Sequence, residues 1–131
     1  MKNELKEKKC HLSVYEQNVL LPILMKGMES KKGKANAVTA RQIIDAMRKH
    51  GLKISRRSIL MLISHIRTND LIVGLMATSA GYYITSNERE LMDYEDALLG
   101  RESAIRKVRM SIKRQRRGMF STIAQRETQL F

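Results

Sequence analysis

Apolar residues recur at helical spacing near the start of the chain. They share one face of a predicted helix, and we expect that face to be core: Tyr15, Val19, Leu20, Ile23, Leu24 and Met28. Ser13 and Glu16 have the spacing of a capping box at the helix start. Pro22 lies inside the pattern and lacks a backbone N–H, so we expect a kink there or two short helices. The Lys- and Gly-rich stretch 30–36 is predicted to be a loop.

Two short helices are predicted next. Thr39 and Gln42 form a second capping box, and Gly51 ends that helix. Its apolar stripe comprises Ala40, Ile43, Ile44 and Met47. Ser55 caps a third helix over 55–69, whose buried stripe comprises Ile59, Leu62, Ile63 and Ile66. Two capped helices joined by about four residues predict a helix-turn-helix unit.

The pattern then changes to one typical of strands. Residues 71–77 and 81–85 are rich in Leu, Ile, Val and Tyr, and a polar tip with Gly81 separates them, which predicts a hairpin. A lone hairpin is marginally stable in water, so it must pack on the helices. We therefore predict a mainly α fold with a small β-hairpin wing (α+β), that is, a winged helix-turn-helix over residues 12–85 with its wing at 77–82.

A long helix is predicted over 86–117, opened by a capping box of Thr85 and Glu88. Its first part is acidic and its second part basic, which complements the helix dipole. Six apolar residues follow one heptad pattern, interrupted by Arg101: Leu91, Tyr94, Leu98, Ile105, Val108 and Ile112. The stripe packs on the helical core or forms a homodimer, and we favour the dimer. Residues 1–11 and 118–131 are expected to be flexible.

Charge points to a polyanionic partner. The 131 residues include 25 Lys and Arg against 13 Asp and Glu, a net charge of +12, and nucleic acid is the commonest polyanion. The basic half of the last helix has three interpretations: a solvated face, non-specific phosphate contacts, or an anionic membrane surface. We rank the membrane last, because such helices usually carry bulky aromatics or a broad Leu face.

Other classes of function lack their signals. Cys10 is the single cysteine, so we expect neither an intramolecular disulfide nor a cysteine-based metal site. No run of 18 apolar residues and no signal-peptide core is found, so we expect a reducing cytoplasm. Without a Gly-rich phosphate loop, a nucleophile–base set or a metal constellation, we expect no enzyme, no cofactor and no metal.

Three segments carry a resemblance to a known family: Thr39-Ala40-Arg41-Gln42-Ile43, Ser55-Arg56-Arg57-Ser58-Ile59 and Gly81-Tyr82-Tyr83-Ile84. They resemble the winged helix-turn-helix at the N-terminus of bacterial biotin repressors and related regulators. The chain, with its acidic-to-basic last helix, also resembles short proteins encoded by phages and other mobile elements. The strong match covers under half of the chain and carries over no biotin ligase activity. For a phage-encoded protein it implies the cytoplasm of the bacterial host.

The resemblance implies duplex DNA as the partner, with the third helix in the major groove. The implied contacts are Arg41, Lys53, Ser55, Arg56, Arg57, Ser58, Met61, Ser64, His65, Thr78 and Ser79. The simpler alternative is that Ser55 only caps its helix and the arginines are solvated. The turn 51–54 is longer than in the family.

The family usually has polar residues where this chain has Leu60 and Met61, which offer no hydrogen bonds to bases. We therefore expect binding dominated by phosphates, in a transcriptional regulator or replication-associated factor. The alternative is a protein-interaction module within a replication or transcription complex.

Overall fold

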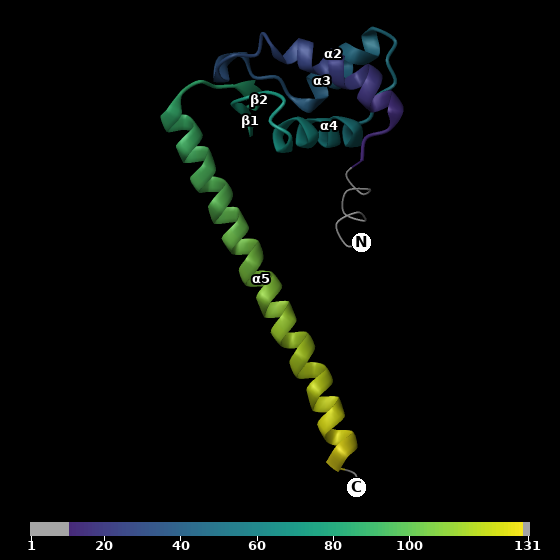
Figure 1. The fold of residues 1–131 in the computed structure, drawn as a ribbon, viewed down its shortest axis with the longest axis vertical. Helices are drawn as coiled ribbons and strands as arrows, with labels where there is room; N and C mark the ends of the chain where they lie inside the picture. The colour runs from purple at the N-terminus through teal and green to yellow at the C-terminus, as the bar shows by residue number, and fades with distance from the viewer. Residues whose placement is uncertain (1–10, 130–131) are drawn as a thin grey trace. The chain divides into compact units, whose positions relative to one another are not determined.

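The computed structural model describes residues 11–129, and the side chains of residues 11–121 (Figure 1). The chain divides into an N-terminal unit, Met1–Glu88, and a C-terminal unit, Arg89–Phe131. Within residues 11–129, the N-terminal unit is helical with one two-stranded antiparallel hairpin, and the C-terminal unit is a single helix, so the mainly α, α+β prediction is confirmed. Residues 1–10, including Cys10, and residues 130–131 lie outside the described residues.

The first helical segment begins at the predicted capping box. The Ser13 N–H donates to Glu16 Oε1 over 2.9 Å, and the Glu16 N–H donates to Ser13 Oγ over 3.1 Å. A π-helical turn, η1 (Glu16–Leu20), leads directly into α2 (Leu21–Met28). In the π turn the Leu21 N–H bonds to the Glu16 carbonyl, five residues earlier. The irregularity expected at Pro22 is therefore a π turn just before the proline, after which the helix continues.

The buried face of this segment is narrower than predicted. Leu20, Leu24 and Met28 are buried, in a row with a spacing of four residues. Tyr15 and Ile23, which the pattern placed in the core, are 40% and 43% exposed. The π turn holds one residue more than an α turn, so Tyr15, which precedes it, is rotated away from the face that follows it. Ile23 follows the π turn and is outside the buried row of Leu20, Leu24 and Met28.

The next two helices follow the predictions closely. α3 (Ala40–Lys49) starts with the Thr39–Gln42 capping box, and α4 (Arg56–Thr68) starts at the N-cap Ser55. Both predicted stripes are buried, and Ile59 and Leu62 are 0% exposed. Gly51, with φ of 78°, lets the chain leave α3, because its N–H bonds to the Arg48 carbonyl over 3.0 Å while the next N–H bonds to Met47.

The hairpin is shorter than predicted. β1 (Leu75–Thr78) pairs antiparallel with β2 (Gly81–Ile84), with Leu75 opposite Ile84 and Thr78 opposite Gly81. Residues 71–74, predicted as strand, form a turn between Asp70 (φ 54°) and Gly74 (φ 81°). These positive φ angles are incompatible with extended backbone, so pairing starts only at Leu75.

The second edge of β2 is bordered by residues 31–38, which were predicted to be mostly loop. The segment contains a short 3-10 helix, η2 (Lys34–Asn36), flanked by two bridges to β2. Lys31 and Gly33 exchange hydrogen bonds of 2.7 and 2.8 Å with Ile84, and Val38 exchanges two of 2.7 and 2.9 Å with Tyr82. β2 therefore lies between β1 and this edge segment, which fastens the hairpin to the chain ahead of α3.

α5 (Glu88–Gln129) forms the C-terminal unit. It begins later than predicted, and the predicted capping box of Thr85 and Glu88 is wrong, because Glu88 is the first residue of the helix and not the third. Thr85 Oγ1 instead accepts a 3.1 Å hydrogen bond from the Asn87 N–H ahead of the helix. The helix also continues beyond Arg117, so most of the segment predicted as a flexible tail is helical. Gly118 costs about 1 kcal/mol relative to alanine, and no proline follows it, so nothing forces the helix to end there.

Candidate nucleic-acid interface

The serines at the start of α4 are used within the helix itself. Ser55 Oγ accepts a hydrogen bond from the Ser58 N–H over 3.2 Å and lies 3.1 Å from Ser58 Oγ. Ser58 is also half-buried. Both hydroxyls therefore orient the first turn of α4, and the capping role expected of Ser55 is confirmed.

Exposed cations surround this helix start. Arg56 and Arg57 are exposed in its first turn, and no ion pair joins either to a carboxylate within residues 11–121. Lys53 is exposed in the turn before α4, and Arg41 is exposed in the first turn of α3. The free N–H groups at a helix N-terminus add a partial positive charge of about half an elementary charge. The start of α4 is thus a positively charged surface built on a buried helical stripe.

A carboxylate from the first helix reaches the same place. The pKa of Glu16 lies below its ordinary value of 4.5, chiefly because its carboxylate accepts the Ser13 N–H, against a smaller opposing effect of burial. The Ser13 and Ser58 hydroxyls and the positive charge of Arg57 lower this pKa further. Glu16 therefore places a negative charge beside Arg57. The capping-box pattern identified Glu16, but its closeness to α4 is a tertiary contact without a local sequence signal.

Two side chains hold the turn between α3 and α4. The Tyr15 hydroxyl donates to the Lys53 carbonyl over 2.9 Å and accepts from the Lys53 N–H over 3.1 Å. Arg48 Nη2 donates to the Ile54 carbonyl over 3.0 Å. The long turn is therefore fixed from both helices that precede α4, by residues the sequence did not single out for this role.

The outward face of α4 is mixed in character. Leu60 is 45% exposed, whereas Met61 is half-buried against the core. Ser64 is exposed, and His65 is half-buried with Asn69 Nδ2 at 3.3 Å from its Nδ1 atom. This face borders a concave surface that encloses a volume of about 560 Å³. The other wall of this concave surface includes Leu12 and Gln17. Met61 and His65 are thus less accessible than a base-reading role requires.

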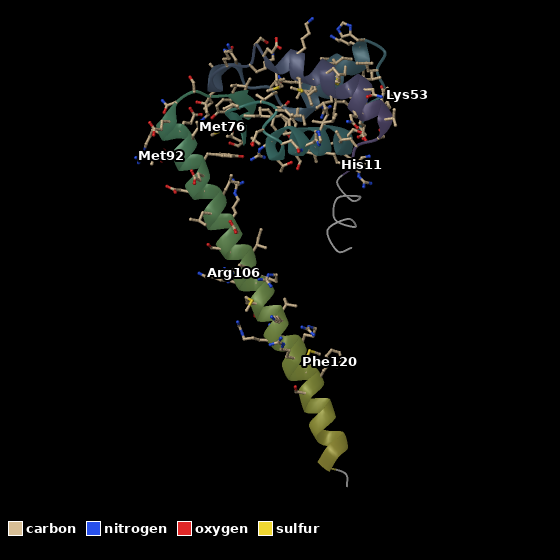
Figure 2. All side chains as sticks on the ribbon, in the orientation of Figure 1. His11, Lys53, Met76, Met92, Arg106 and Phe120 are labelled. Atoms are coloured by element: carbon tan, nitrogen blue, oxygen red, sulfur yellow. The ribbon has the colours of Figure 1, made fainter. Side chains whose placement is uncertain are left out.

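The strand β1 of the hairpin lies apart from the turn that precedes α4. Figure 2 shows Lys53 and Met76 at opposite ends of the N-terminal unit. Thr78 Oγ1 donates to the Gly81 carbonyl over 3.3 Å and accepts from the Ala80 N–H over 3.2 Å, so the turn itself uses this hydroxyl. Of the two predicted contacts at the tip, Ser79 is the exposed one.

The described part of the chain shows neither a metal-binding cluster nor a membrane-spanning helix. Among residues 11–121, whose side chains are described, no three His, Cys, Asp or Glu side chains are grouped so as to hold a metal ion. In the same part of the chain, no helix combines the length and apolar character needed to cross a membrane. The exposed cations Arg41, Lys53, Arg56 and Arg57 form the candidate site of the N-terminal unit.

Comparison with known proteins leaves this geometry as the basis for assigning function. No protein family, no curated protein and no solved structure matches the chain.

Proposed function

We propose that the N-terminal unit is a winged helix that binds duplex DNA without catalysing a reaction. The order of its elements supports this: α2, an edge segment, α3, α4, β1 and β2, with the edge segment bordering β2. In such a fold, the second helix of the helix-turn-helix lies in the major groove, which makes α4 the DNA-facing helix.

The observation that carries the proposal is the charge at the start of α4. Arg56 and Arg57 are exposed at the positive end of the helix dipole. Lys53, three residues before Arg56, is also exposed. A helix N-terminus with adjacent guanidinium groups suits phosphate, because backbone N–H groups and planar side-chain donors converge on its oxygens. The fully buried Ile59 and Leu62 hold this end of α4 in place.

The outward face of α4 favours weak sequence preference. Base edges are distinguished mainly by hydrogen bonds from polar side chains, and Leu60 and Met61 supply none. Phosphate contacts position a protein on DNA without specifying sequence. The proposed role is therefore a regulator or replication-associated factor whose affinity comes mostly from phosphates.

The test is a fluorescence anisotropy titration of a labelled duplex at about 50 mM and about 200 mM salt. Removing two phosphate contacts in Arg56→Gln/Arg57→Gln is expected to weaken binding about tenfold at low salt and to reduce the log–log salt slope by about 2. The matched control is Lys26→Gln/Lys34→Gln, which removes the same charge from exposed residues of α2 and η2. Absent binding at the lower salt, or an equal loss in the control, would contradict the proposal.

A second candidate is a protein-interaction module, favoured by the exposure of Leu60 beside the concave surface along α4. Leu60→Glu separates the two functions. If α4 faces DNA, the added carboxylate repels phosphates and weakens duplex binding; if α4 faces a protein, duplex affinity is unchanged. Ile23→Glu is the control, because Ile23 has a similar exposed fraction, 43% against 45%, on a different helix.

A further inference from the structure

α5 carries a row of exposed apolar side chains along one face. The row follows a heptad with Leu91, Leu98, Ile105 and Ile112 at the a positions and Tyr94, Arg101 and Val108 at the d positions. Leu98 is 39% exposed, and Ile105, Val108 and Ile112 are 57–69% exposed. Such a row matches the seam of a coiled coil, in which a and d side chains insert between those of a partner helix.

The residues flanking the d positions are charged in a definite order. The e positions hold three acids followed by two bases, all exposed: Glu88, Glu95, Glu102, Arg109 and Arg116. Flanking charges govern the partner and the orientation of a coiled coil. On the other flank, the g positions after Glu90 are small residues, so the e row dominates the electrostatics of the seam.

The same order holds for the helix as a whole. Residues 88–102 contain six acidic and two basic side chains, whereas residues 103–117 contain seven basic side chains and no acidic one. A parallel partner with the same sequence would set acidic against acidic and basic against basic. An antiparallel partner sets each half against its opposite, which is attractive over most of the length, although Glu102 then lies near the partner's Glu102 at the centre.

We propose that two copies of this chain pair through α5 in antiparallel orientation. In the register that sets Leu98 opposite the partner's Val108, Tyr94 lies opposite the partner's Ile112. The same register brings Glu95 near the partner's Arg109 and Glu88 near the partner's Arg116. The apolar row supplies affinity and the charge order selects the direction. This pairing does not depend on DNA binding, and duplex DNA is the competing occupant of the basic half.

The orientation is measured by pulsed EPR on the full chain in a Cys10→Ser background, with one spin label at residue 92, 104 or 121. In the antiparallel pair the labels at 104 lie close together, whereas axial rise separates those at 92 by about 33 Å and those at 121 by about 54 Å. Similar short distances at all three positions would establish a parallel pair and overturn the proposal. A chain that is monomeric in the absence of DNA would also overturn the proposal.

A charge reversal tests the cause of the orientation. In Glu95→Lys/Glu102→Lys the e row becomes basic apart from Glu88, and the dissociation constant from sedimentation equilibrium is expected to rise at least about tenfold, that is, about 1.4 kcal/mol. Adding Arg109→Glu to the same chain restores an opposite-charge pair with residue 95 of the partner, keeps the pairing of Glu88 with the partner's Arg116, and is expected to restore association. Circular dichroism reports helix content in each variant. Unchanged association in the first variant, or no recovery in the second, would overturn the role given to the e row.

Discussion

Glu16 links three features at the scale of a single residue: the cap of the first helix, the start of α4 and the charge of Arg57. Its pKa is lowered from 4.5, so the folded protein binds a proton there less readily than the unfolded chain. The ionised carboxylate therefore adds stability above about pH 4.5, and this contribution is lost as the pH falls through the lower folded-state pKa. The acidic limb of the stability curve depends in part on this one group.

Glu16→Gln keeps an acceptor for the Ser13 N–H but removes the charge. Its free energy of unfolding, measured by urea denaturation between pH 3 and pH 6, is expected to fall less on acidification than that of the parent protein. Duplex affinity is expected to rise, because the carboxylate beside Arg57 no longer opposes phosphate. Glu29→Gln, at the exposed end of α2, is the control. An acid dependence unchanged from the parent protein would contradict the assignment.

Gly81 is needed for the close approach of β2 to the edge segment. Its φ is 116°, and a Cβ there would lie 2.6 Å from the Val38 carbonyl oxygen. Gly81→Ala is expected to lower the free energy of unfolding by more than about 1 kcal/mol. Gly27→Ala, on a helical residue with nothing within 4 Å of its Cβ, is expected to raise it by about 0.5–1 kcal/mol. Equal effects in the two variants would show that the contact is unimportant.

At the scale of elements, the position of α4 depends on the turn before it. Tyr15→Phe removes the hydroxyl that bonds both Lys53 backbone groups. The expected loss is about 0.5–1.5 kcal/mol in the free energy of unfolding, measured with urea. Tyr82→Phe makes the same chemical change at a half-buried site whose hydroxyl bonds to nothing within residues 11–121. A smaller loss for Tyr15→Phe than for this control would contradict the role of Tyr15.

Elements with local signals were predicted well. The capping boxes at Ser13 and Thr39, the cap at Ser55 and the stripes of α3 and α4 involve residues three or four positions apart, and the structure confirms them. The π turn before Pro22 was not predicted, because periodicity alone cannot distinguish a kink from an added residue. The pairing of Val38 with Tyr82 joins residues far apart in sequence, so no local pattern reveals it.

Part of the candidate site could likewise be predicted from local sequence patterns, and part of it could not. Exposure of Arg56 and Arg57 followed from the helical phase of α4, whose other face was identified as core. The nearby carboxylate of Glu16 and the half-burial of Met61 and His65 depend on how the first helical segment, which contains η1, packs on α4. Packing between segments is decided by the whole chain, which is why the sequence predicted the cations but not their surroundings.

At the scale of the whole molecule, Arg101 interrupts the apolar row of α5. If two copies pair along this row, Arg101→Leu extends the seam and is expected to lower the dissociation constant of the dimer about tenfold or more, measured by sedimentation equilibrium. Ser103→Leu adds the same side chain at an outward position of the same heptad and is expected to change it little. Equal effects would indicate non-specific apolar association instead of a defined seam.

The edge segment also protects the outer edge of β2 from solvent. The amide protons of Tyr82 and Ile84 bond to carbonyls of Val38 and Lys31, not to β1. They can exchange with deuterium only after the edge segment has detached from β2. The amides that join β2 to the edge segment are therefore expected to open together, as one cooperative unit. Equal protection factors are expected at the Tyr82, Ile84, Gly33 and Val38 amides. Exchange of these outward-facing β2 amides is then governed by residues that precede α3, well before the hairpin in the chain.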